Sequence, residues 1–149
     1  MKKIISVLIL TMTLMSLSLA VDDCCKVGES KAKPVTKSAI LNPGQKIALP
    51  DGNFLVYKFS QKPALGTAVV VVKIVDAKGT QIAPYTIRGN AGMPSMQGAH
   101  DSGEVAFELN KRKDYLLPVN VVMQGAWEVK IKVKKGSEEI FKGVVSFHV

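Results

Sequence analysis

The sequence predicts an all-β domain that follows an N-terminal export segment. From Gln45 onward, short apolar runs are separated by turns that contain glycine or proline. One of these runs, residues 127–133, alternates strictly between apolar and charged side chains, which is the period of a strand with one face in water. No long segment has the helical period. Roughly seven short strands with such turns are typical of an antiparallel, immunoglobulin-like β-sandwich.

Residues 1–20 have the features of a cleavable signal peptide. Lys2 and Lys3 precede an apolar stretch that runs to about Leu19, and the small residues Ser18 and Ala20 stand at the positions that a signal peptidase reads. An uncleaved inner-membrane anchor is the alternative, because the stretch approaches the ~18 apolar residues that span a bilayer. Hydroxyl side chains within the stretch, and two acidic residues directly after it, favour cleavage. We therefore expect a periplasmic protein.

The rest of the chain divides into a leader and one domain. Residues 21–44 are polar and predict a flexible leader, and residues 45–149 are long enough for one sandwich domain. The full chain has a formal net charge of +8, spread over predicted strands and turns. The densest run, Lys111-Arg112-Lys113, is interrupted by Asp114. We interpret it as a solvated turn and expect no nucleic-acid partner for an exported protein.

The two cysteines, Cys24 and Cys25, are adjacent and lie just after the predicted cleavage site. Neighbouring Cα atoms are about 3.8 Å apart, less than a disulfide usually spans, so a bond between them would be strained. Asp23 stands where a lipoprotein would carry a small residue. The pair is either part of a tail prone to intermolecular crosslinks, or a soft metal clip or redox handle, since thiolates bind Cu(I) well.

The predicted strands carry different signals of burial. Residues 68–75 form an almost continuous valine run, as in a buried strand, and end at a turn. Residues 115–122 contain Pro118, which predicts an edge strand or a bulge. In the last strand, Phe141, Val145 and Phe147 share one face and His148 points to the other. In chain order, the predicted strands cover residues 54–59, 68–75, 85–88, 104–109, 115–122, 127–133 and 140–149.

The segment from Gly89 to Gly103 departs from the strand pattern. Its glycines and its proline predict a loop, and a loop of about 15 residues inside a compact domain is often functional. It carries Met93, Met96 and His100. Three of the six methionines of the chain leave with the signal segment, so that Met123, in the turn before Trp127, is the third that remains.

Thioether and imidazole donors together suit copper, and thioether favours Cu(I). Each candidate ligand also has a simpler interpretation. A loop methionine can fill a gap at the end of the sandwich, and a histidine on an outward face can simply be solvated. Sandwich loops gather at two ends, so the candidates meet only if their turns lie at the same end. The candidate metal ligands are Met93, Met96, Met123, His100 and His148.

The sequence has no enzyme signature. It lacks a Gly-x-Ser-x-Gly elbow and a Gly-rich phosphate loop after a strand. The acids Glu104, Glu108 and Glu128 fall on predicted strand faces, and nothing selects a pair for acid–base chemistry. We therefore expect a protein that is not an enzyme and has no evident small-molecule substrate. Trp127 is most simply a core residue of the sandwich.

Three short motifs give the chain a resemblance to a known family. The turn Asp76-Ala77-Lys78-Gly79 precedes Met93-Pro94-Ser95-Met96, and Met123-Gln124-Gly125-Ala126-Trp127 follows about 27 residues later. In these motifs, over roughly residues 66–149, the chain resembles the YtkA-like/FixH-like family of bacterial envelope domains. The resemblance implies an immunoglobulin-like sandwich, and it places Met93, Met96 and Met123 at the family's motif positions. It also implies copper handling or cytochrome oxidase assembly, although many FixH-like members keep a transmembrane helix.

Two functions are open at this point. The first is a periplasmic module that holds Cu(I) and passes it to an envelope or membrane protein, such as a copper acceptor or an oxidase assembly component. The second is a metal-free interaction domain that docks onto an envelope complex through a sheet edge or the Gly-rich loop. The two differ in whether the three methionines and His100 gather at one end of the sandwich.

Overall fold

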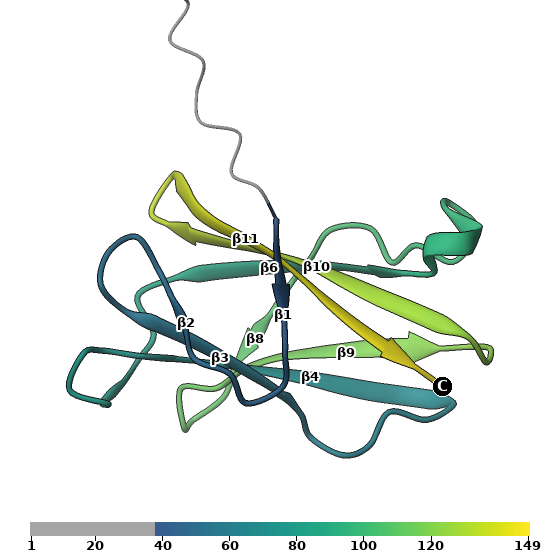
Figure 1. Cartoon of the computed structure of the whole chain (residues 1–149), viewed down its shortest axis with the longest axis horizontal. Helices are drawn as coiled ribbons and strands as arrows, with labels where there is room; N and C mark the ends of the chain where they lie inside the picture. Colours follow the sequence, from purple (N-terminus) through teal and green to yellow (C-terminus); the bar gives the residue numbers. More distant parts are fainter. Residues whose placement is uncertain (1–37) are drawn as a thin grey trace, which may run out of the picture. The chain divides into compact units, whose positions relative to one another are not determined.

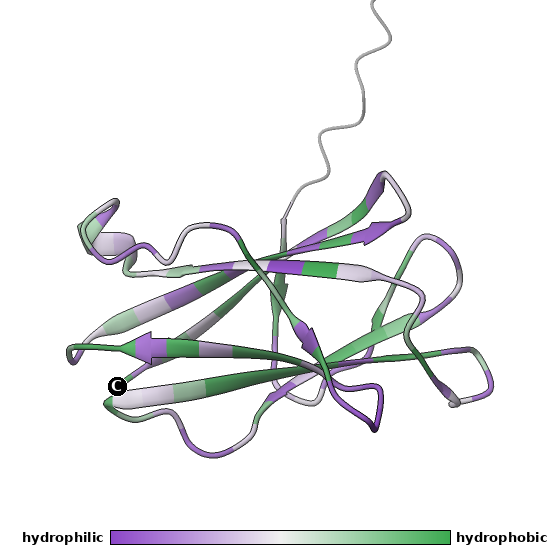
Figure 2. Cartoon of the chain, turned by 180° about the vertical axis from the view of Figure 1, so that it is seen from behind, coloured by the Kyte–Doolittle hydropathy of each residue, from purple (hydrophilic) through white to green (hydrophobic). Residues whose placement is uncertain are grey.

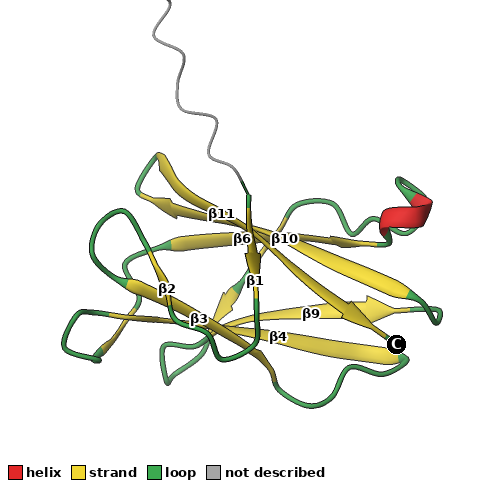
Figure 3. Cartoon of the chain, in the orientation of Figure 1, coloured by secondary structure: helices red, strands yellow, loops and turns green. Residues whose placement is uncertain are grey.

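The computed structural model describes residues 38–149. The predicted signal segment, Cys24 and Cys25 lie outside the described residues, as does the leader up to residue 37. The described part consists of eleven strands and one short 3-10 turn, η1 (Figures 1 and 3). The elements are β1 (Ala39–Leu41), β2 (Ile47–Ala48), β3 (Phe54–Phe59), β4 (Gly66–Val75), β5 (Gln81–Ile82), β6 (Thr86–Gly92), η1 (Pro94–Met96), β7 (Val105–Ala106), β8 (Glu108–Leu109), β9 (Tyr115–Val121), β10 (Ala126–Lys135) and β11 (Glu138–His148).

The strands form two sheets that pack face to face. Sheet A has the order β1-β11-β10-β6-β7, and sheet B has the order β2-β3-β4-β9-β8, with β5 paired to β4. The pairs are antiparallel except that β1 runs parallel to β11. The predicted all-β sandwich is confirmed. It has more than the predicted seven strands, because several short strands at the sheet edges carry too few residues to show a period.

The alternating pattern of β10 decides which of its faces enters the core. Trp127, Val129 and Ile131 are buried and Lys130 is exposed, as the sequence pattern predicts.

Pro118 lies on a partly unpaired side of β9, as the sequence predicts. Only the first two residues of β9 pair with β8, and among the described residues nothing pairs with that side of β9 at Pro118. The missing N–H of proline is tolerated at such an edge.

Three differences from the sequence prediction go beyond shifts of one or two residues at strand ends. The predicted strand 104–109 is divided, because the chain passes from sheet A in β7 to sheet B in β8, with the buried Phe107 between them. Strand β6 continues to Gly92, since its whole length pairs with β10. Strand β1 lies within the segment predicted as the leader, and its Leu41 is buried against Gly143 of β11.

The close approach of the two sheets depends on a glycine in the middle of β6. A Cβ atom at Gly89 would lie 2.6 Å from Cδ2 of Leu117 in sheet B and 2.9 Å from Cε2 of Phe107. These distances are far below an ordinary carbon–carbon contact of about 3.5–4 Å. Gly89 therefore leaves the space that Leu117 and Phe107 fill.

Candidate metal site at one end of the sandwich

The two segments that carry the methionines lie at the same end of the sandwich. The loop that follows β6 starts where Gly92 pairs with Glu128, close to the start of β10. The turn between β9 and β10 leads into that same start, and Ala126 pairs with His148 at the end of β11. In Figure 1, η1, the β9–β10 turn and the C-terminus all lie at the right-hand end.

The loop after β6 turns sharply at the Met-Pro-Ser-Met motif. Pro94 begins η1, where its fixed φ suits the first helical position. The amide of Met96 donates to the carbonyl of Met93 at 3.0 Å, and the amide of Ala99 donates to the carbonyl of Met96 at 3.2 Å. Met93 is 7% exposed and belongs to the core, whereas Met96 is 41% exposed. The motif thus presents one buried and one accessible thioether.

Met93 packs on the turn that carries Met123. A Cβ atom at Gly125 would lie 2.9 Å from Cε of Met93, so the methyl group rests on the backbone of Gly125. Gly125 has φ +135°, a conformation that glycine adopts readily and other residues avoid. Its N–H and C=O pair with the backbone of Val149 at 2.8 and 3.1 Å. Met93 therefore contacts the residue two positions after Met123, in a turn whose backbone is hydrogen-bonded to Val149, directly after β11.

Trp127 is hydrogen-bonded to the same turn. The ring is 2% exposed, and its Nε1–H donates to the carbonyl of Met123 at 3.1 Å. A buried indole N–H needs such a partner. Met123 itself is 37% exposed. The prediction that Trp127 is a core residue is confirmed, and its polar atom also fixes the backbone of Met123.

Met93 and Met96 line the same small hollow, of about 30 Å³. The hollow lies on the outward face of sheet A, since Asn90 and Glu128 alternate with buried neighbours in β6 and β10. A cavity of this volume accommodates about one water molecule. Lys130 pairs with Glu128 at 3.0 Å beside it. The remaining lining residues are Gly92, Gln97, Gly98 and Asp101.

His100 does not line this hollow. It lines a neighbouring cleft of about 230 Å³ near the end of β9, together with Ser102, Asn120 and Trp127. Asp101 lines both the hollow and the cleft. His148 is exposed on β11 and lines neither. The structure therefore brings Met93 and Met96 together and leaves the two histidines apart from them. Met123 lines neither the hollow nor the cleft, and its turn meets Met93 at Gly125.

Sequence reasoning missed two residues at this end. Asp101 follows His100 in the Gly-rich loop, but no sequence motif marks it as a ligand. Glu128 has the pattern of an ordinary carboxylate on an outward strand face. Within residues 38–149, no three side chains of His, Cys, Asp or Glu lie close enough to hold one metal ion together. A site at this end would depend on the thioethers, with Asp101 or Glu128 as additional oxygen donors.

Comparisons with known proteins bear on the fold. No protein-family model matches the chain, and no curated protein matches it, so the resemblance to the YtkA-like/FixH-like family stays a prediction. Among solved structures the chain is similar to FetP of uropathogenic Escherichia coli strain F11, which was expressed recombinantly in the periplasm of E. coli. The TM-score is 0.50 at 12% identity, over 72% of this chain and 93% of FetP. At this identity the likeness shows a shared fold.

Proposed function

We propose that this chain is an exported envelope protein that binds Cu(I) through thioethers at the end of its sandwich. One observation carries the proposal. Buried Met93 connects the hollow that it shares with Met96 to the turn that carries Met123. Met96 and Met123 thus lie on separate segments that both adjoin Met93. The expected ligands are Met93, Met96 and Met123.

The donor set matches the chemistry of the ion. Cu(I) is soft and prefers thiolate and thioether ligands. Metal binding at His or Cys releases protons, whereas a thioether has no proton to lose, so binding by methionines should depend little on pH. Met96 and Met123 are partly accessible while Met93 is buried. This asymmetry suits an ion that is held from inside the protein and approached by a partner from outside.

The envelope location rests on the N-terminal sequence and on the chemistry of the site. The likeness to a protein that was produced in the periplasm is compatible with it. No helix in the described part of the chain is long and apolar enough to cross a membrane. N-terminal sequencing of the protein from the periplasmic fraction should begin at Val21. Retention of Met1 in the membrane fraction would favour the anchor instead.

The test is an anaerobic Cu(I) titration of the purified protein with Cys24→Ser and Cys25→Ser. The cysteines are removed because thiolates bind copper by themselves. We expect one Cu(I) per chain. The triple variant Met93→Leu, Met96→Leu, Met123→Leu should fold normally and lose Cu(I), since Leu matches Met in size and such exchanges usually cost under about 1.5 kcal/mol.

Gln97→Ala is the matched control. Gln97 lines the same hollow but offers no soft donor, so this variant should bind Cu(I) as the parent does. If the cysteine-free parent takes up no Cu(I), or if the triple variant binds it as tightly as the parent, the methionine site is wrong. The metal-free interaction domain would then be the better description of the chain.

A further inference from the structure

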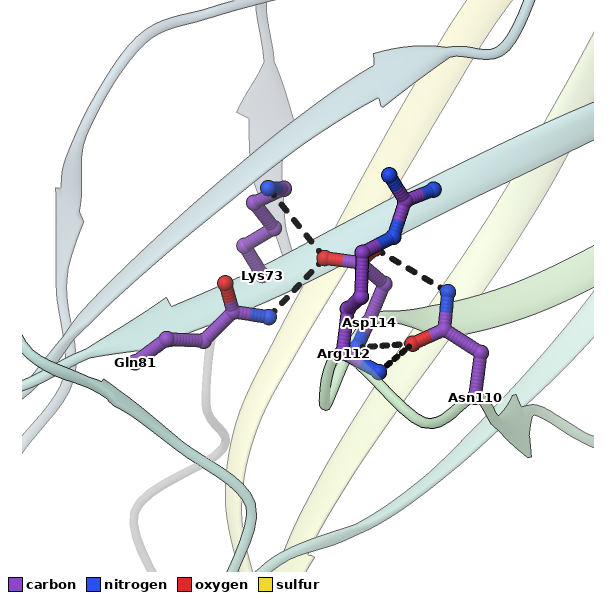
Figure 4. Close-up of polar contacts among 5 residues, drawn as sticks. All are labelled: Lys73, Gln81, Asn110, Arg112 and Asp114. Carbon is purple, nitrogen blue, oxygen red and sulfur yellow. Dashed lines mark hydrogen bonds and ion pairs between the residues drawn. The ribbon is translucent and has the colours of Figure 1, made fainter.

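The turn between β8 and β9 is built around a buried carboxylate, Asp114. It is 4% exposed, and four side chains converge on it (Figure 4). Gln81 and Lys73 reach one of its oxygens at 2.9 and 3.2 Å, and Asn110 and Arg112 approach the other at 3.0 and 3.7 Å. The contacts link the turn to β4 and β5, which are distant in the sequence.

The backbone of this turn is equally well held. The side-chain oxygen of Asn110 accepts the amides of Arg112 and Asp114 at 2.8 and 2.9 Å, and the amide of Asn110 donates to the carbonyl of Asp114 at 2.9 Å. Lys113 has φ +63° and is the one residue other than glycine with positive φ among residues 38–149. A non-glycine residue in this region marks a backbone that its surroundings strongly determine.

The turn presents cations to solvent. Lys111, Arg112 and Lys113 are all exposed, with 86% of the Arg112 side chain accessible. The neighbouring turn of residues 76–80 adds the exposed Lys78. We call Lys78, Lys111, Arg112 and Lys113 the basic knuckle. Both turns lie at the end of sheet B opposite the methionines, toward the left of Figure 1.

The nearby carboxylates offset part of the charge of the basic knuckle, since Asp114 pairs with Arg112 as well as with Lys73. Asp114 is buried beneath the turn, and Oδ1 of Asp76 accepts the backbone amides of Lys78 and Thr80 at 2.9 and 2.8 Å. Glu108 on β8 is the one exposed carboxylate in the two turns and the β8 strand beside them. The outermost charges of this end of sheet B are thus mainly positive.

An apolar strip adjoins the basic knuckle. The outward positions of β4 include Val69 and Val75, which are half-buried, and the outward positions of β9 include the half-buried Leu116 and the exposed Pro118. Val71 lies between them on the same face but is only 6% exposed, and Lys73 separates it from Val75. In Figure 2 the ribbon of β4 is green over most of its length. On sheet A, by contrast, the outward positions of β10 are charged.

We propose that the basic knuckle docks this end of the domain onto an anionic phospholipid surface. Lys and Arg side chains near such a surface are attracted by its negative potential, and neighbouring apolar groups add to the attraction. Protein interfaces are usually centred on a buried apolar or aromatic anchor in a pocket, and the hollow and the cleft described above lie at the opposite end. Binding of single-stranded nucleic acid usually adds aromatic stacking, and the knuckle has no aromatic residue. On a membrane, the domain would hold its methionine end away from the lipid.

Vesicle sedimentation without added metal tests this proposal. The probes are vesicles of phosphatidylethanolamine with and without about 30% phosphatidylglycerol, which is anionic. We expect the exported protein to bind only the anionic vesicles, and to release as salt rises. Each cation raises partitioning roughly fivefold, so Lys78→Gln, Lys111→Gln and Lys113→Asn together should weaken binding about 100-fold. Asn tolerates the positive φ at 113.

The matched control is Lys46→Gln, Lys62→Gln and Lys132→Gln, which removes the same charge outside the knuckle. This variant should weaken binding far less than the knuckle variant. The lysines of the leader are present in all variants, so they do not affect the comparison. Equal loss in both triple variants, or no preference for anionic vesicles, would overturn the proposal. Absence of vesicle binding, with retention on immobilised polyglutamate that the knuckle variant loses, would assign the surface to an acidic protein. Because no metal is used, the result is independent of the copper titration.

Discussion

Asp114→Asn should destabilise the domain, and the size of the loss should depend on pH. Burial by itself raises the pKa of Asp114, but hydrogen bonds from Gln81 and Asn110 and the ammonium of Lys73 outweigh it, and the pKa falls from 3.8 to about 2. Each pKa unit corresponds to about 1.4 kcal/mol, so the ionised carboxylate contributes roughly 2 kcal/mol to the free energy of unfolding at neutral pH.

The direction of the pH dependence follows from the lowered pKa. The contribution of Asp114 is complete above the unfolded pKa of 3.8, declines as the pH falls below it, and is lost once the pH passes the folded value of about 2. In the Asn variant this contribution is absent at every pH. The side-chain amide of the Asn variant would also place an N–H group opposite residues that donate hydrogen bonds to the carboxylate in the wild type. The loss at pH 7 should therefore reach about 2–4 kcal/mol.

The assay is urea unfolding of both proteins, followed by circular dichroism at several pH values from 7 to 2. The stability difference between wild type and variant should shrink by roughly 2 kcal/mol between pH 5 and pH 2. Glu108→Gln is the control, since this exposed carboxylate on β8 should change stability by less than about 0.5 kcal/mol. A difference that stays constant with pH, or an Asp114→Asn loss under about 0.5 kcal/mol, would refute the account of this turn.

Two further substitutions test the methionine end of the sandwich. Trp127→Ala should cost about 3–5 kcal/mol in urea unfolding, because it removes a fully packed ring, and a loss under about 1 kcal/mol would mean that the ring does not fill the core. Gly125→Ala should cost about 1–3 kcal/mol and displace Met93, whose methyl group occupies the space of the new Cβ. Gly66→Ala is the control, because Gly66 has φ +100° and open space around the Cβ, so that its loss reports mainly backbone strain. Equal losses for both variants would contradict the Met93 contact.

The strands with a clear local period could be predicted from the sequence. The predicted strand 54–59 coincides with β3, and residues 127–133 lie within β10. Both could be predicted because the alternation of buried and accessible positions follows from the types of consecutive residues. The pairing of β1 with β11 could not be predicted in this way. Ala39 pairs with Gly143, and a three-residue strand has no period of its own. The division of residues 104–109 between two sheets likewise depends on distant partners.

The candidate site was only partly visible in the sequence. The Gly-rich loop and its methionines could be recognised, because residue type and turn chemistry are local properties. The separation of His100 from Met93 and Met96 could not, since it depends on how the loop folds over β6 and β9.

By itself, the sequence determined the all-β class, the inward face of β10 and the residues that offer soft donors. The tertiary structure alone decided that Met93 rests on Gly125. It also decided that Lys73 pairs with Asp114 beneath the Lys111–Lys113 turn, which the sequence presented as a solvated charge run. Contacts of this kind join residues far apart in the chain. Their geometry follows from sheet register and packing, and no local pattern of side chains encodes it.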